Sequence, residues 1–140
     1  MENTIRWLRI SFWAGAILDV LAAIQMLFPA VFAATSGLSG FHPGRDYSYA
    51  MGMGAALMLG WTVLLIWADR KPLERKGILP ITVFPVVAGM ALNEVYAVFA
   101  TGFLPLATVI PIWIVQTILA VVMLVSSVRA GKIRETDAVS

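Results

Sequence analysis

The chain has 140 residues, of which 60% are hydrophobic and 13% are charged, whereas a soluble domain carries about 25% charged residues. It has no cysteine and one histidine, His42, which excludes disulfides and thiolate chemistry and leaves too few ligands for an all-protein zinc or haem site. The net charge of +2 gives no support for nucleic-acid binding. This balance indicates an integral membrane protein, for which we expect no metal, no cofactor and no nucleic-acid partner.

Four apolar stretches are long enough to cross a bilayer, whose hydrocarbon core needs about 20 helical residues. We predict spans at about residues 7–34, 49–68, 78–101 and 104–128 of a single domain, residues 1–140. The predicted fold class is therefore all-α, an integral membrane four-helix bundle.

The first predicted span, residues 7–34, has a basic start like a secretory signal. It is longer than a signal core of roughly 7–15 residues and contains Asp19, so we interpret it as a retained span. Pro29 is expected to kink it, because proline removes a backbone donor. One face of this helix is small and polar, which suits close helix packing, and we predict that it points inward. Its residues are Phe12, Gly15, Asp19, Ala22, Ala23 and Met26.

Residues 35–48 are rich in glycine, proline, serine and aspartate, which predicts a loop. Its tyrosine suits the headgroup layer of a membrane, and a lid over the mouth of a cavity is the alternative role.

The second predicted span, residues 49–68, carries small residues at intervals of four: Gly52, Ala56 and Gly60. This row is typical of a face that packs against a neighbouring helix. We expect that packing to be within the chain. Trp61 follows the row and is expected to line the interior.

The third predicted span, residues 78–101, contains the pair Asn93–Glu94 between long apolar runs. A carboxylate inside a lipid-spanning segment costs several kcal/mol unless it is paired, hydrated or protonated. Glu94 therefore needs a partner, and Asp19 of the first span is a candidate. Asn93 and Tyr96 flank the face that carries Glu94. Two prolines in the first half of the span predict a bent or irregular helix there.

The fourth predicted span, residues 104–128, has Trp113 and Gln116 near its middle. At about 1.5 Å of rise per residue, the polar residues of three spans fall at similar depths. We therefore predict one polar layer with an aromatic wall as the ligand-binding site. Its predicted members are Asp19, Glu94, Asn93, Gln116, Tyr96, Trp61 and Trp113.

The basic residues divide unequally between the two sides of the predicted membrane. Two lie in the N-terminal stretch, four in residues 69–77 and three in the C-terminal tail, whereas Arg45 alone lies on the other side. Because lysine and arginine remain in the cytoplasm, both termini are expected to be cytoplasmic. The expected location is the inner (plasma) membrane, with a multi-pass topology.

Several functions suit two acids inside such a bundle. The acids can be structural, with one protonated carboxyl donating to the other acid or to Gln116. They can bind and release a proton or an organic cation during transport. A hydrophobic molecule can also enter the bundle, where the carboxyls bind its polar end or act as acid and base. We favour binding of a small or lipid-like ligand over enzymatic turnover. An accessory subunit of a larger membrane complex, or a homo-oligomer, is a further alternative.

Two stretches of the first half, AGAILDVLAAIQMLFPAVFA and YAMGMGAALMLGWTVLLIWADRKP, resemble the DoxX-like group of small four-helix bacterial membrane proteins. In that group a first helix ends in a proline, and a glycine-dotted second helix follows a short loop. The resemblance implies the four-helix topology and no particular reaction.

Overall fold

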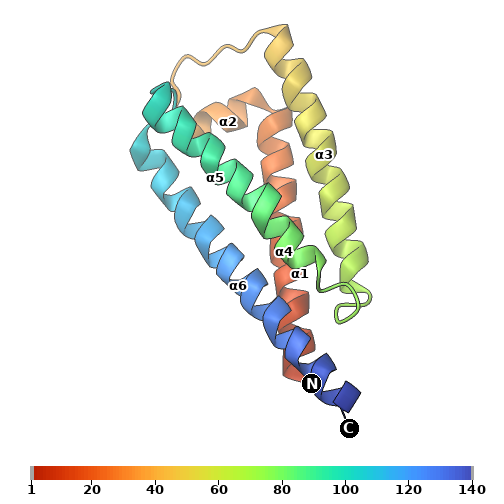
Figure 1. Ribbon diagram of the computed structural model, residues 1–140. Helices are drawn as coiled ribbons and strands as arrows, with labels where there is room; N and C mark the ends of the chain where they lie inside the picture. Colours follow the sequence, from red (N-terminus) through yellow and green to blue (C-terminus); the bar gives the residue numbers. More distant parts are fainter. Residues whose placement is uncertain (1, 140) are drawn as a thin grey trace.

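The computed structural model describes residues 2–139 of the chain, with the side chains of residues 2–132. This part of the chain is helical and contains no strand. Its elements are α1 (Glu2–Leu27), α2 (Pro29–Ser36), α3 (Arg45–Asp69), α4 (Ile78–Ile81), η1 (Thr82–Val87), α5 (Ala88–Val95), η2 (Tyr96–Ala100) and α6 (Leu106–Val139). Figure 1 shows their arrangement.

Four helical segments are long and apolar enough to cross a membrane. They are Glu2–Leu27, Arg45–Asp69, Ile78–Ala100 and Leu106–Lys132. The prediction of an all-α four-helix membrane bundle is thereby confirmed. The third segment is built from α4, η1, α5 and η2 in succession.

The first span ends earlier than predicted, because Pro29 breaks the helix instead of only kinking it. Phe28 has φ −118° and ψ 93°, which is extended backbone, and α2 begins at Pro29 as a separate helix that turns away from α1 (Figure 1). A residue that precedes proline is driven out of the α region, and proline itself fits the first turn of a new helix.

Two other helices extend beyond their predicted bounds. The second begins at Arg45 instead of residue 49, and α6 runs to Val139 instead of ending near residue 128. Hydropathy delimits the apolar part of a helix, whereas its backbone hydrogen bonds continue into the polar flanks.

The third span is irregular as predicted, and its irregularity has a defined form. Residues of η1 and η2 are π-helical, and Pro85 lies inside η1. In a regular α-helix proline leaves the carbonyl four residues earlier without a donor, and the wider π turn allows that carbonyl to meet a later N–H. The two π turns stand on either side of α5, the segment that carries Glu94.

The bundle is most tightly packed at the end that holds both chain termini and the 70–77 connection (Figure 1). The hydroxyl oxygens of Ser11 and Ser126 share a hydrogen bond of 3.0 Å between α1 and α6. The Arg75 guanidinium lies 3.3 Å from the centre of the Trp67 ring, in cation–π contact. The largest fully buried side chains of this core are Phe12, Leu8, Leu65, Leu79 and Met123.

The inward face predicted for the first span is confirmed, and the face predicted for the second is wrong. Phe12 and Asp19 are buried on α1. On α3, by contrast, Ala56 is exposed, and a Cβ atom on Gly52 or Gly60 would meet nothing within 4 Å. The face of α3 that meets α1 is a different one, made by Gly54, Ala55, Met58, Thr62 and Leu65.

Candidate functional site

A cavity of about 320 Å³ lies among the four spans. It receives Asp19 and Gln25 from α1, Met58 from α3, Met90 from α5 and Gln116 from α6. Most of the remaining lining is aliphatic. In Figure 1, α5 and α6 run obliquely to α1.

Asp19 is the charged group of this cavity. It is only 7% exposed, and its Oδ2 atom has no hydrogen-bond partner within the described part of the chain. None of the residues that line the cavity is a lysine, an arginine or a histidine. The fold therefore buries a carboxyl group without a basic side chain to pair with it.

Glu94 is linked to the same cavity through Gln116. The Gln116 Nε2 atom donates to Glu94 Oε1 at 2.9 Å. The other two terminal oxygens of the pair, Glu94 Oε2 and Gln116 Oε1, are buried and have no hydrogen-bond partner among residues 2–132. Because Gln116 also lines the cavity with Asp19, three of the four predicted polar residues form one connected site.

Trp113 lies beside this pair and is half-buried on α6. Its indole is near Glu94, although the described residues give its Nε1 atom no hydrogen bond of regular geometry. Trp113 and Gln116 line a groove of about 490 Å³ between the third span and α6. Val87 and Gln116 line both the groove and the cavity, so the two spaces share a wall.

Three of the predicted site residues lie elsewhere. Asn93 is exposed and Tyr96 is 63% exposed, so both point away from the interior. Neighbouring helical residues point about 100° apart, and Asn93 therefore cannot share the direction of Glu94. Trp61 packs against the tight core, where its Nε1 atom donates to Thr82 Oγ1 at 3.1 Å.

Sequence reasoning missed other residues that line the cavity, notably Gln25 and Met58. The signal for Gln25 was available, since it is a polar residue inside an apolar span and lies near the inward face of α1. Met58 carried no such signal, because its role depends on which side of α3 meets α1.

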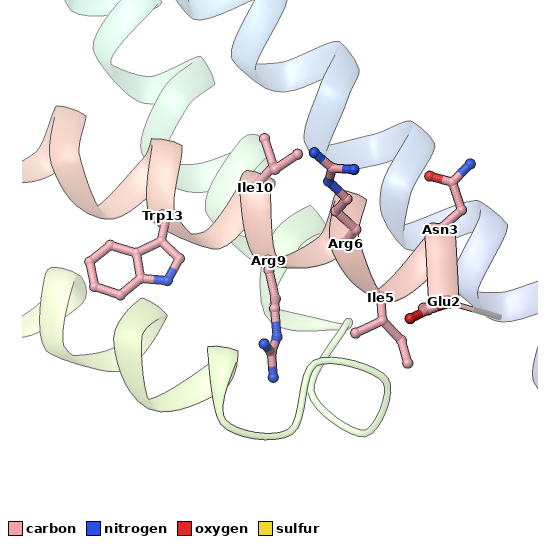
Figure 2. A pocket seen from close by; sticks show the side chains of 7 residues that line it. All are labelled: Glu2, Asn3, Ile5, Arg6, Arg9, Ile10 and Trp13. Carbon is pink, nitrogen blue, oxygen red and sulfur yellow. The ribbon is translucent and has the colours of Figure 1, made fainter.

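A larger hollow, of about 620 Å³, runs along the N-terminal part of α1 (Figure 2). All seven of its lining residues belong to α1, and Figure 2 shows Arg6 and Arg9 leaving the helix in opposite directions. Arg9 Nε lies 3.9 Å from Asp69 Oδ1, and Trp13 Nε1 donates to Asp69 Oδ2 at 3.2 Å. These contacts attach α1 to the end of α3, and we assign this hollow a structural role.

The opposite end of the bundle is closed by an aromatic cluster. Phe41 of the 37–44 connection lies 5.6 Å from Phe32, 5.3 Å from Tyr47 and 6.1 Å from Phe103, measured between ring centres. Such edge-on contacts favour a fixed arrangement. They hold the connection against α2 and the turn that precedes α6.

The fold and the site together define a class: an all-helical protein with four candidate membrane spans and an acid-lined cavity among them. Comparisons with protein-family models, with curated proteins and with solved structures give no match to this chain. Within the described residues, no three histidine, aspartate or glutamate side chains group closely enough to hold a metal ion.

Proposed function

We propose that this protein binds a small or lipid-like ligand in the cavity that contains Asp19. The observation that carries the proposal is the buried Asp19 Oδ2 atom, which has no partner in the described chain and lies in a largely apolar space. A buried polar atom without a partner costs about 1–3 kcal/mol, which a ligand with a donor group offsets. The volume of about 320 Å³ is near the lower limit of ligand pockets, roughly 300 Å³.

The test measures thermal unfolding of the purified chain in detergent with a panel of fatty acids, isoprenoid alcohols and lipophilic amines. We expect at least one class to raise the Tm of the wild type. Asp19→Asn and Glu94→Gln should raise the Tm of the free protein and remove the ligand effect, because a functional acid is retained at the expense of stability. If both variants are less stable and no compound acts on the wild type, the acids are structural.

A proton- or cation-coupled transporter is our second candidate. The observations that favour it are the connection from Asp19 through Gln116 to Glu94 and the two π turns around α5, since π turns are frequent at functional sites. Proton flux into proteoliposomes on addition of a bound compound distinguishes transport from binding alone.

An accessory subunit is our third candidate, favoured by a row of small residues on α3 in which Ala56 and Gly60 are exposed and Gly52 is half-buried with open space beside it. Small residues on an outer face allow a partner helix, or a second copy, to approach closely. Blue-native electrophoresis of the native membrane separates a lone bundle from a complex.

We infer that both termini are cytoplasmic and that the membrane is the inner (plasma) membrane. The basic residues gather at the end of the bundle that holds the termini and the 70–77 connection (Figure 1), which supports this orientation. The chain has no cysteine, so single-cysteine variants report sidedness directly. Ser39→Cys should react with an impermeant maleimide in intact cells, and Glu74→Cys only after lysis.

The DoxX-like resemblance remains a proposal that rests on the sequence of the first half of the chain. It supports the four-helix topology and adds no reaction to the functions proposed above.

A further inference from the structure

We propose that the cavity selects an organic cation: a compact apolar amine whose N–H groups donate to the Asp19 carboxylate and the Gln116 carbonyl. This inference rests on the proposed function and narrows the ligand to one chemical class. It follows from three properties of the cavity, which are the kind of polar atom it offers, its charge and its shape.

The buried polar atoms of the cavity that lack a partner in the described part of the chain are acceptors. A carboxylate only accepts hydrogen bonds, so the amide nitrogen of Gln116 faces Glu94 and its carbonyl oxygen is left over. Asp19 Oδ2 and Gln116 Oε1 are both buried, and both are without a donor in the described part of the chain. A ligand that satisfies them must therefore bring donors, and a group with two N–H bonds serves both.

The ionisable side chain of the cavity is an acid, and no basic side chain in the lining compensates it. Lysine, arginine and histidine are missing from its lining, and Asp19 is its acid. A buried carboxylate without a counter-charge is unfavourable. An alcohol can donate a hydrogen bond but leaves the carboxylate charge unpaired. An ammonium group donates hydrogen bonds and also pairs that charge. A carboxylic acid adds a second negative charge and is rejected.

The shape of the cavity suits an amine whose remaining part is a compact hydrocarbon. The walls include Met58 and Met90, and methionine side chains adjust to irregular apolar surfaces. The volume of about 320 Å³ excludes long-chain lipids as whole occupants. A cage hydrocarbon with one amino group is therefore a suitable probe.

The experiment uses three probes with the same cage: 1-adamantylamine, 1-adamantanol and 1-adamantanecarboxylic acid. Their affinities for the full chain in dodecyl maltoside are measured by calorimetry and by the shift in Tm. We expect the amine to bind at least tenfold more tightly than the alcohol, and the acid not to bind. Asp19→Asn should weaken the amine at least tenfold and leave the alcohol unchanged. Glu74→Gln, which makes the same charge change in an exposed ion pair with Lys71, is the matched control and should change neither affinity.

A second variant keeps the test decisive if Asp19→Asn does not fold. Ala22→Phe adds a ring at the lining of the cavity and should abolish binding of all probes. If the amine and the alcohol bind equally and Ala22→Phe removes both, the choice of a cation is wrong although the cavity binds ligands. If no probe binds the wild type, or Ala22→Phe leaves binding intact, both this inference and the proposed ligand site are wrong.

Discussion

Gln116 on α6 holds Glu94 on α5 through a single hydrogen bond of 2.9 Å, from Nε2 to Oε1. Such a bond contributes to helix association because the hydrophobic effect does not drive helices together within lipid. It also fixes the direction of the Gln116 carbonyl, which we propose as a contact for the ligand. The Gln116 side chain thus contributes both to the packing of α5 against α6 and to the lining of the cavity.

Gln116→Leu removes this bond and leaves the buried Glu94 carboxyl without a partner. We expect the free energy of unfolding to fall by about 0.5–2 kcal/mol, the range for polar contacts between membrane helices. Unfolding in mixed detergent–SDS micelles measures it. Glu94→Gln keeps an acceptor oxygen for Gln116 and should not lower the free energy of unfolding. Equal losses for the two variants contradict a role for this bond.

Gly15→Val tests the close approach of α1 to the core. A Cβ atom there would lie 2.6 Å from Met123 Cε and 3.0 Å from Leu65 Cδ1, and both of these neighbours are fully buried. Overpacking of this kind costs about 1–3 kcal/mol. Gly52→Val is the control, because that position has nothing within 4 Å. The same SDS titration should show a loss for Gly15→Val alone.

Trp61→Phe separates the tight core from the cavity. The variant loses the donor to Thr82 Oγ1, a bond of 3.1 Å, and should lose about 0.5–1.5 kcal/mol of stability. Amine affinity should stay within twofold of the wild type, because Trp61 does not line the cavity. A large loss of affinity with an unchanged Tm would restore Trp61 to the binding site.

Gly102→Ala tests the turn between the third and fourth spans. Gly102 has φ 62°, and the left-handed region costs other residues about 1–2 kcal/mol. The Tm should fall accordingly. Gly89→Ala, near the start of α5 with open space around it, should instead raise stability by about 0.8–1 kcal/mol through helix propensity. A rise in Tm for both variants means that the turn tolerates a side chain.

The fold was largely predictable because its causes are local. Apolar length predicted the spans, and the small and polar residues of the first span predicted its inward face, which includes Asp19. The depth of a residue in the membrane can be counted along its helix. Gln116, Glu94 and Asp19 have similar depths, which is why the sequence predicted that they lie together.

The angular positions of residues were the part that sequence did not predict. Asn93 was grouped with Glu94 because the two lie at the same depth, yet depth does not show the direction of a side chain, and a helix points adjacent residues about 100° apart. On α3, the row of small residues through Gly52 was expected to be the packing face, whereas the face through Gly54 meets α1, and spacing alone does not show which face does so. The choice depends on how whole helices fit together.

The π turn η1 has a consequence for chain length. A π turn holds about one residue more than an α turn, and at 3.6 residues per turn that extra residue rotates the remainder of the span by about 100°. Deleting one residue between Thr82 and Val87 would leave Leu79 seated among its neighbours and swing the Glu94 carboxyl away from Gln116. A variant shortened by one residue at this point is therefore expected to lose the hydrogen bond between Gln116 and Glu94, even though every side chain of the cavity is the same.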